Sequence, residues 1–277
     1  MAEAAAHGNG MRFELLGPLR ALRADGDEIE LGPPKQRAVL AVLLHQDGRS
    51  MSYDALVDAV WGVDTPTHVR NLVQKYVSGL RRAFTGGPAP ELVWTGSGYR
   101  LSGAAIDDMR ERHALLRAAL AARDSGDLRR AGELAARGEA LWRGEFAEGL
   151  TGPYLQAERR RWAEKRLLVL ESRLEGDIQL GRYHECVHEL MRQVAAHPLR
   201  ERLVWLLMLA LYRSGRSSDA LLAYEEARGR IAEVMGADPG PELRALHQRL
   251  LRQDPALSPG SVPGSVPGDV PRGVPAA

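Results

Sequence analysis

A single amphipathic helix followed at once by a short hairpin is the feature that most constrains this chain. Between residues 69 and 84 apolar side chains recur at helical spacing, and polar side chains fill the opposite arc. Two β-prone runs, 92–94 and 99–101, follow and are separated by Thr95-Gly96-Ser97-Gly98. The apolar arc holds Val69, Leu72, Val73, Tyr76, Val77, Leu80 and Phe84, and the polar arc holds Arg70, Asn71, Gln74, Ser78, Arg81 and Arg82. One face is suited to packing, and the other offers groups that contact phosphates and base edges in DNA.

The segments before this helix supply the rest of a small domain. Residues 12–31 alternate like three or four short antiparallel strands, and Gly32-Pro33-Pro34 then ends the sheet and starts a helix over residues 35–45. Ser52 is a good N-cap for a second helix over residues 53–61, which Gly62 ends. A small sheet, three helices and a terminal hairpin predict a winged helix-turn-helix domain over residues 11–102. Its third helix is expected in the major groove, and residues 1–10 are expected to be disordered.

The polar arc divides into two expected roles in DNA binding. Charged side chains neutralise phosphates, whereas amides and hydroxyls reach base edges. The expected phosphate contacts are Arg70, Lys75, Arg81 and Arg82, the base contacts are Asn71, Gln74 and Ser78, and the hairpin contacts to the backbone or the adjacent minor groove are Thr95, Ser97 and Arg100. Trp94 and Tyr99 are predicted to be core residues. The alternative for this arc is an ordinary solvated helix face, which the two preceding helices and the following hairpin disfavour.

After residue 107 the sequence predicts helices alone. Seven amphipathic segments are separated by Gly-rich or Pro-containing turns, and together they predict an all-α domain over residues 107–252. Gly181-Arg182 followed by Cys186 recurs 34 residues later as Gly215-Arg216 followed by Ala220. That offset fits tetratricopeptide-like helical hairpins, which usually present a surface to peptides or helices. The Pro/Gly-rich residues 255–277 are expected to be a disordered tail.

Composition and motifs exclude several classes of protein. The net charge is only +1, but residues 65–101 hold five Lys or Arg against one acid, Glu91. Cys186 is the only cysteine and is expected to be buried, and His184 and His188 lack a third metal ligand. No nucleotide-binding glycine motif, catalytic triad or carboxylate dyad occurs, so neither an enzyme nor a cofactor is expected. Without a secretory signal or a long apolar run, the protein is expected to be cytoplasmic, away from the membrane.

Several long motifs, in order, resemble one known family. They are FELLGPLRAL, LGPPKQRAVLAVLL, LVDAVWG, NLVQKYVSGLRRAF, GSGYRL, ALWRGE, HPLRERLVWLLMLALYRSGRSSDALLAY and GADPGPELRAL, between about Met11 and Arg252. The chain resembles the Streptomyces antibiotic regulatory protein family of transcription activators. The resemblance implies a mainly α fold with a small antiparallel β component: an OmpR-type winged helix followed by a tetratricopeptide-like bacterial transcriptional activation domain. The ATPase domain of the larger members is not expected in this chain.

The resemblance also implies partners and roles. Members bind direct repeats in promoter DNA upstream of biosynthetic genes and recruit RNA polymerase holoenzyme, often as dimers on DNA. By motif position the DNA-reading roles carry to Asn71, Gln74, Lys75, Ser78, Arg81 and Arg82, and the turn Trp61-Gly62-Val63 corresponds to the loop that approaches polymerase. Gly79 departs from a slot that is usually basic, and glycine inside a helix costs about 1 kcal/mol relative to alanine. We therefore expect lower DNA affinity or a less rigid helix at this position.

The function indicated by the sequence is a sequence-specific DNA-binding activator of a secondary-metabolite gene cluster. Two alternatives remain open at this point. In the first, the chain is a helical adaptor whose repeats bind a protein partner. In the second, it is a sensor that takes a small ligand on the concave helical surface.

Overall fold

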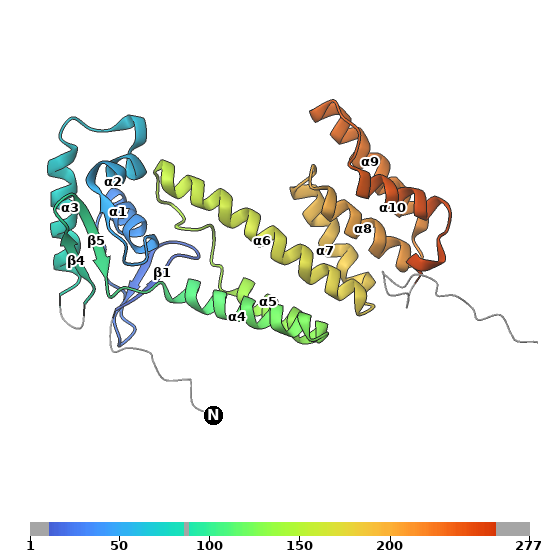
Figure 1. Cartoon of the computed structure of the whole chain (residues 1–277), viewed down its shortest axis with the longest axis horizontal. Helices are drawn as coiled ribbons and strands as arrows, with labels where there is room; N and C mark the ends of the chain where they lie inside the picture. Colours follow the sequence, from blue (N-terminus) through green and yellow to red (C-terminus); the bar gives the residue numbers. More distant parts are fainter. Residues whose placement is uncertain (1–10, 86–88, 259–277) are drawn as a thin grey trace, which may run out of the picture. The chain divides into compact units, whose positions relative to one another are not determined.

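The computed structural model describes residues 11–85 and 89–258 (Figure 1). The chain forms two compact units. The N-terminal unit consists of the residues up to Ser125 together with Glu133–Leu168, and the C-terminal unit consists of Gly126–Gly132 together with the residues from Val169 onwards. The described part is mostly helical with small antiparallel sheets, which confirms the predicted fold class.

The first sheet of the N-terminal unit is smaller than predicted. Strands β1 (Arg12–Glu14) and β2 (Arg20–Leu22) pair antiparallel, with Phe13 opposite Ala21. The third expected strand, at 28–31, is reduced to an isolated bridge between Leu22 and Glu28. Gly32 and Pro33 follow almost at once, and proline has no N–H to continue a ladder, so the prediction of three or four strands was wrong.

The second sheet assembles around the hairpin. Strands β4 (Glu91–Trp94) and β5 (Gly98–Ser102) form the predicted hairpin, and β3 (Met51–Ser52) pairs with β5 on its other side. The two-residue strand β3 was not predicted. Gly98 lies opposite Ser52, and a Cβ at this glycine would lie 1.9 Å from the carbonyl oxygen of Met51. The pairing of β3 therefore requires a glycine at position 98.

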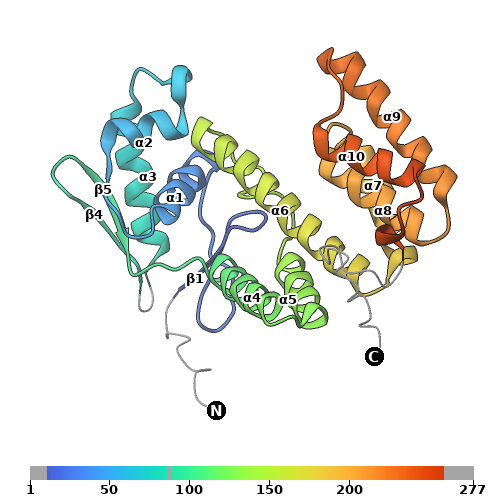
Figure 2. The same cartoon turned by 45° about the vertical axis from the view of Figure 1, so that its right-hand side comes forward.

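Three helices form the helical part of this domain, and the second and third pack on the first (Figure 2). They are α1 (Pro34–His45), α2 (Tyr53–Val60), which is followed by the 3-10 turn η1 (Gly62–Asp64), and α3 (Val69–Ala83). The seven residues Ala38–Leu44 are all buried, as expected for the middle helix of the domain. The Oγ of Ser52 accepts from the N–H of Ala55, which confirms the predicted N-cap of α2. The core fixes α3 through Val73, Val77 and Leu80.

The remaining helices follow the predicted order. They are α4 (Asp107–Asp124), α5 (Leu128–Ala140), α6 (Pro153–Gln179), α7 (Tyr183–Ala196), α8 (Glu201–Arg213), α9 (Ser217–Met235) and α10 (Pro241–Leu251). In the C-terminal unit α7 packs on α8 and α8 on α9. Gly181 and Gly215 have positive φ angles of 83° and 81° in the turns before α7 and α9. Cys186 and Ala220 are buried one turn into these helices, where small side chains let helices approach closely.

The compact units do not divide at the predicted junction between residues 102 and 107. Asp108, at the start of α4, is buried and its carboxylate accepts from the backbone N–H groups of Leu15 (2.9 Å) and Leu16 (2.8 Å). Arg143 donates from Nη2 to the same carboxylate at 3.1 Å, and its backbone N–H donates to the carbonyl oxygen of Leu16 at 2.8 Å. These contacts place α4 and the segment around Arg143 in the same unit as the first sheet, although they lie far away in the sequence.

The first residues of the predicted disordered tail are folded. Residues Pro255–Leu257 form the 3-10 turn η2, and Leu257 is buried. The Nε of Arg213 on α8 donates to the carbonyl oxygen of Leu257 at 3.1 Å, which holds the turn against the C-terminal unit. The rest of the predicted tail and the predicted disordered residues 1–10 lie outside the described residues. None of the helices in the described ranges combines the length and apolar character needed to cross a membrane.

Candidate nucleic-acid interface

The two faces of α3 differ in exposure as the sequence predicts. Val73, Val77 and Leu80 are buried against the core, and Phe84 at the end of the helix contacts Phe13 edge-on with ring centroids 6.0 Å apart. Every side chain of the predicted polar arc is exposed, and so is Lys75 at its margin; these residues are Arg70, Asn71, Gln74, Lys75, Ser78, Arg81 and Arg82. The predicted hairpin residues Thr95, Ser97 and Arg100 are exposed as well.

The charges on this surface favour an anionic partner. Within the part of the chain that the structure describes, no carboxylate lies within ion-pairing distance of Arg70, Lys75, Arg82 or Arg100. Some exposed arginines elsewhere are neutralised, as in the pairs Arg216–Asp219 and Arg228–Glu225. Unneutralised cations on one face produce a local positive potential that a net charge of +1 conceals.

Hydrogen bonds hold the hairpin next to α3. Arg81 donates from Nε to the carbonyl oxygen of Leu92 on β4 at 2.8 Å, so this guanidinium bridges the helix and the hairpin. At the turn, the N–H of Thr95 donates to the carbonyl oxygen of Gly98 at 2.9 Å, and the hydroxyl groups of Thr95 and Ser50 share a hydrogen bond of 2.8 Å. The N–H of Tyr53 donates to the carbonyl oxygen of Ser97 at 2.9 Å, which connects the turn to the start of α2.

A hollow of about 530 Å³ lies between α3, the hairpin and the start of α2. The sequence did not predict it, because its lining comes from three separate segments. Its polar lining is Tyr53, Arg70, Gln74, Ser78 and Arg81, and its apolar lining is Val77, Trp94 and Tyr99. Two guanidinium groups, an amide, two hydroxyls and aromatic walls suit a group that carries negative charge beside an apolar surface, such as a nucleotide of a DNA strand.

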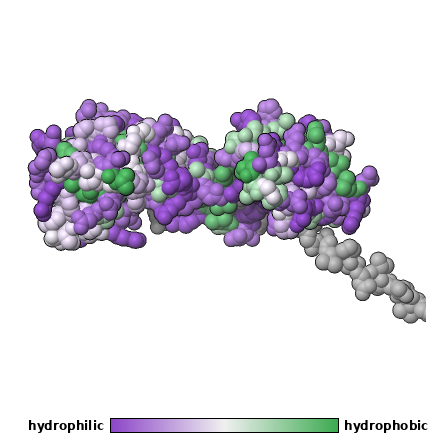
Figure 3. All heavy atoms as spheres, turned by 90° about the horizontal axis from the view of Figure 1, so that it is seen from above, coloured by the Kyte–Doolittle hydropathy of each residue, from purple (hydrophilic) through white to green (hydrophobic). Residues whose placement is uncertain are grey.

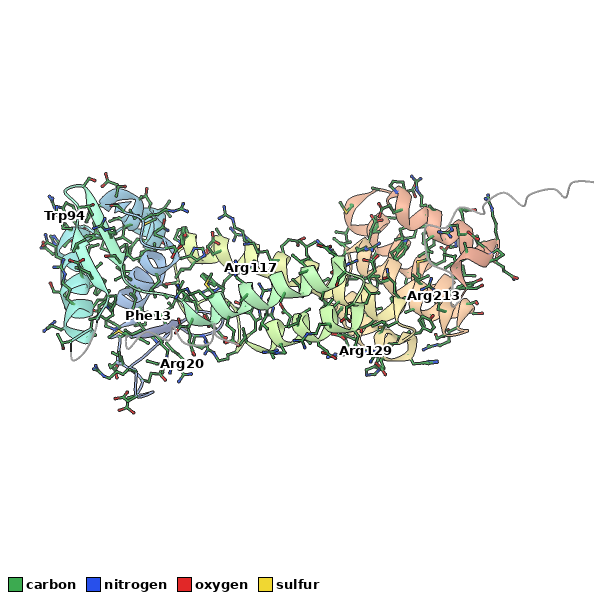
Figure 4. All side chains as sticks on the ribbon, turned by 60° about the horizontal axis from the view of Figure 1, so that its bottom comes forward. Phe13, Arg20, Trp94, Arg117, Arg129 and Arg213 are labelled. Carbon is green, nitrogen blue, oxygen red and sulfur yellow. The ribbon has the colours of Figure 1, made fainter. Side chains whose placement is uncertain are left out.

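The prediction that Trp94 and Tyr99 are both core residues is wrong for Trp94. Tyr99 is buried as expected, but Trp94 is 47% exposed and its ring stands edge-on to Tyr99 at 5.0 Å. Trp94 is the last residue of β4 and pairs with Tyr99, where the sheet passes beyond the apolar face of α3 and lies beside its polar arc. Figure 4 shows it at the outer end of the hairpin. Its position directly before the turn was the one sequence signal for this exposure.

Tyr53 is the other residue of the hollow that sequence reasoning missed. Its hydroxyl oxygen is buried and has no hydrogen-bond partner among the described residues. Burial raises the pKa of Tyr53, and the nearby Arg70 acts in the opposite direction. The hydroxyl therefore stays protonated at neutral pH and can donate to a ligand in the hollow.

The residues of the loop predicted to approach polymerase differ in their exposure to solvent. Trp61 is buried, stacks on Tyr76 with ring centroids 6.4 Å apart, and lies under the ammonium group of Lys35 at 5.7 Å. Gly62 has a positive φ of 59°, and Val63 is 100% exposed. A partner that approaches this loop would therefore meet Val63, while Trp61 supports the loop from beneath.

Gly79 faces the interior side of α3. A Cβ at this position would lie 2.5 Å from Oε1 of Gln36 on α1. Gln36 is buried, and its Nε2 donates to the carbonyl oxygen of Leu31 at 2.9 Å. A long basic side chain at position 79 would have to displace Gln36, so this glycine serves the packing of α3 on α1.

Other candidate sites do not assemble. No group of three or more His, Cys, Asp or Glu side chains that could hold a metal ion occurs among the described residues. Cys186 is buried, as predicted, and burial raises the pKa of its thiol to about 12. A thiol of this pKa is not an effective nucleophile at neutral pH.

Comparison with known proteins agrees with this architecture. The family model for the bacterial transcriptional activator domain matches residues 107–251, just over half of the chain, and the model for the C-terminal domain of transcriptional regulatory proteins matches residues 26–101. The regulatory protein DnrI of Streptomyces peucetius is 32% identical over 257 residues, which cover 89% of this chain and 94% of DnrI. The chain belongs to the Streptomyces antibiotic regulatory protein family. The resemblance inferred from the motifs is thus confirmed.

Two further relatives are larger than the matched region. The regulatory protein AfsR of Streptomyces coelicolor is 45% identical over 250 residues, which cover 90% of this chain, so the chain spans 25% of the length of AfsR. The structure of EmbR of Mycobacterium tuberculosis in complex with a low-affinity phosphopeptide superposes with a TM-score of 0.78 at 33% identity. That match covers 88% of this chain and 66% of the EmbR chain.

Proposed function

We propose that this protein is a sequence-specific DNA-binding transcriptional activator of a secondary-metabolite gene cluster. The observation that carries the proposal is the exposed polar face of α3, on which Arg70, Lys75 and Arg82 face no carboxylate of the described chain. The hollow beside it adds the hydroxyl of Tyr53 from α2 and the aromatic rings of Trp94 and Tyr99 from the hairpin. A face of cations, amides and hydroxyls on a helix fixed by its opposite side has the chemistry that duplex DNA requires.

In the proposed mechanism, position on the duplex is fixed before sequence is read. Arg70, Lys75 and Arg82 contact phosphates, and Asn71, Gln74 and Ser78 reach base edges in the major groove. The hairpin residues Thr95, Ser97 and Arg100 contact the backbone or the adjacent minor groove. Two copies occupy direct repeats of a promoter, and the exposed turn at Val63 meets RNA polymerase holoenzyme.

A gel shift with the upstream region of the protein's own gene, at two salt concentrations, tests DNA binding. Arg82→Ala should weaken binding to all sequences and reduce the salt dependence by about one ion equivalent, as expected for a phosphate contact. Gln74→Ala should relax specificity at one base-pair position by about 1–3 kcal/mol. Arg137→Ala, a change at an exposed arginine of α5 in the same unit, is the matched control. Unchanged binding and footprints for both interface variants would contradict the assignment.

Transcription in vitro separates DNA binding from activation. Val63→Asp places a charge at a fully exposed position in the 3-10 turn η1, outside the α-helices. We expect this variant to keep its gel-shift affinity and lose activated transcription with purified holoenzyme. Full activation by Val63→Asp would remove the turn from the proposed mechanism while leaving the DNA interface intact.

A further inference from the structure

A second surface of the N-terminal unit combines exposed cations with exposed leucines. It is formed by His113, Arg117 and Leu120 of α4 and by Lys165 and Leu168 of α6, and we call it the α4–α6 strip. Residues 113, 117 and 120 share one side of α4, because they are separated by four and then three positions. Residues 165 and 168 are likewise neighbours on α6. Figure 4 labels Arg117 on α4.

The two helices bring His113 and Lys165 to the same tryptophan ring. The His113 ring stacks on that of Trp162, with centroids 5.9 Å apart and planes 26° apart, and the Lys165 ammonium lies 4.5 Å above the same indole. Burial lowers the pKa of His113, and the charges of Arg112, Lys165 and Arg117 add to this effect. The cations of α4 and α6 therefore share one surface, above a buried tryptophan.

The charge on the strip is not compensated within the described chain. Neither Arg117 nor Lys165 has a carboxylate within ion-pairing distance among the described residues. The neighbouring Arg112 and Arg166 do have a carboxylate partner, since both pair with Glu139, at 2.8 and 3.1 Å. The strip thus retains a positive charge beside Arg112 and Arg166, which are both neutralised by Glu139.

The leucines distinguish the strip from the DNA interface. Leu120 is 60% exposed and Leu168 is 52% exposed, and each lies three residues beyond a cation of the strip. On the face shown in Figure 3 the hydrophobic areas lie scattered among hydrophilic ones. In the strip, each exposed leucine is one helical turn from an exposed cation. A phosphate backbone offers no apolar group to pack against leucine. An amphipathic helix of a protein partner does, because it can bury its apolar side chains against the two leucines.

We propose that the α4–α6 strip binds an acidic amphipathic helix of a protein partner. Carboxylates of the partner contact Arg117 and Lys165, and its apolar side chains cover Leu120 and Leu168. Complementary charge speeds and orients the encounter, and the leucines supply the buried contact. The proposal concerns a surface away from α3 and stands whether or not α3 binds DNA.

Fluorescence anisotropy with the full chain tests the proposal. The probe is a labelled synthetic helical peptide with leucines at helical spacing and glutamates on the flanks; a second peptide carries lysines in place of the glutamates. We expect the acidic peptide to bind and the basic peptide not to bind. The double variant Arg117→Glu, Lys165→Glu should weaken binding at least about tenfold. Leu120→Ser with Leu168→Ser should also weaken it, whereas Arg137→Glu should leave it unchanged.

Three results would overturn the proposal. They are equal binding of both peptides, no loss on charge reversal, or a gel shift of duplex DNA that is lost on charge reversal at the strip. The last result would assign the strip to flanking DNA. The wild-type comparison of the two peptides needs no variant, so it remains decisive if a variant fails to fold. A wild-type gel shift on the same samples reports separately on the proposed DNA-binding function.

Discussion

Gly79 shows how one residue of the proposed reading helix serves packing. In an isolated helix, alanine would be more stable than glycine by about 1 kcal/mol. Here a Cβ would lie 2.5 Å from Oε1 and 3.0 Å from Cδ of the buried Gln36. Displacing Gln36 would break its hydrogen bond to the carbonyl of Leu31 and leave polar groups unpaired, which costs about 1–3 kcal/mol. We therefore expect Gly79→Ala to lower the free energy of unfolding by about 1 kcal/mol in urea titrations.

A double-mutant cycle separates the two effects. In the background of Gln36→Ala the space next to position 79 is vacant, so Gly79→Ala should there raise the free energy of unfolding by up to about 1 kcal/mol. The change of sign is the diagnostic result. If Gly79→Ala stabilises the wild type as much as it stabilises the Gln36→Ala background, the contact with Gln36 has no energetic consequence.

Arg81 and Arg82 are adjacent arginines with different expected behaviour. Arg81 donates to the carbonyl oxygen of Leu92 and so holds the hairpin, whereas no such contact is described for Arg82. Arg81→Ala should weaken DNA binding and also lower the free energy of unfolding by about 1 kcal/mol, the typical net contribution of one hydrogen bond. Arg82→Ala should weaken binding alone, as measured by gel shift together with urea titration. Equal stability of the two variants would contradict the structural role of Arg81.

At the scale of elements, Asp108 joins α4 to the first sheet. Its buried carboxylate accepts from Leu15, Leu16 and Arg143. Asp108→Ala leaves two buried N–H groups without an acceptor and removes one of the two carboxylates that Arg143 contacts, the other being Glu14. We therefore expect a loss of about 3–5 kcal/mol in the free energy of unfolding. Asp124→Ala, at the exposed end of the same helix, should change it by less than about 0.5 kcal/mol. A small effect of Asp108→Ala would show that apolar packing alone holds α4 in place.

The elements also show what the sequence could predict. Helix α3 and its exposed arc follow from periodicity, because burial of one face is a local pattern. The two-residue strand β3 has no periodicity, and its pairing depends on the absence of a side chain at Gly98. The contact of Asp108 with Leu15 spans 93 positions, so no local pattern reports it. Trp94 and Tyr53 were missed for the same reason, since the hollow that they line exists only once α2, α3 and the hairpin meet.

At the scale of the whole molecule, histidines that are partly desolvated connect stability to pH in both units. Burial lowers the pKa of His45 and His113 in the N-terminal unit and of His247 in the C-terminal unit. In the unfolded chain these histidines take up a proton near pH 6.5. In the folded protein they take it up only at a lower pH. These groups therefore stabilise the fold fully above pH 6.5, and their contribution is lost as the pH falls towards their folded pKa values.

His45 is the most direct test of this dependence. Its Nδ1 lies 2.7 Å from the hydroxyl of Tyr154, its ring contacts Phe146 edge-on at 5.2 Å, and burial outweighs the attraction of Glu158 on its pKa. We expect the free energy of unfolding to fall between pH 7.5 and 5.5, and His45→Gln to reduce that fall by about 1.4 kcal/mol for each unit by which folding lowers the pKa. Burial raises the pKa of Asp108, which acts with the opposite sign, but this contribution is common to both proteins and cancels in the comparison. An identical pH dependence in His45→Gln would show that His45 titrates alike in the folded and unfolded chains.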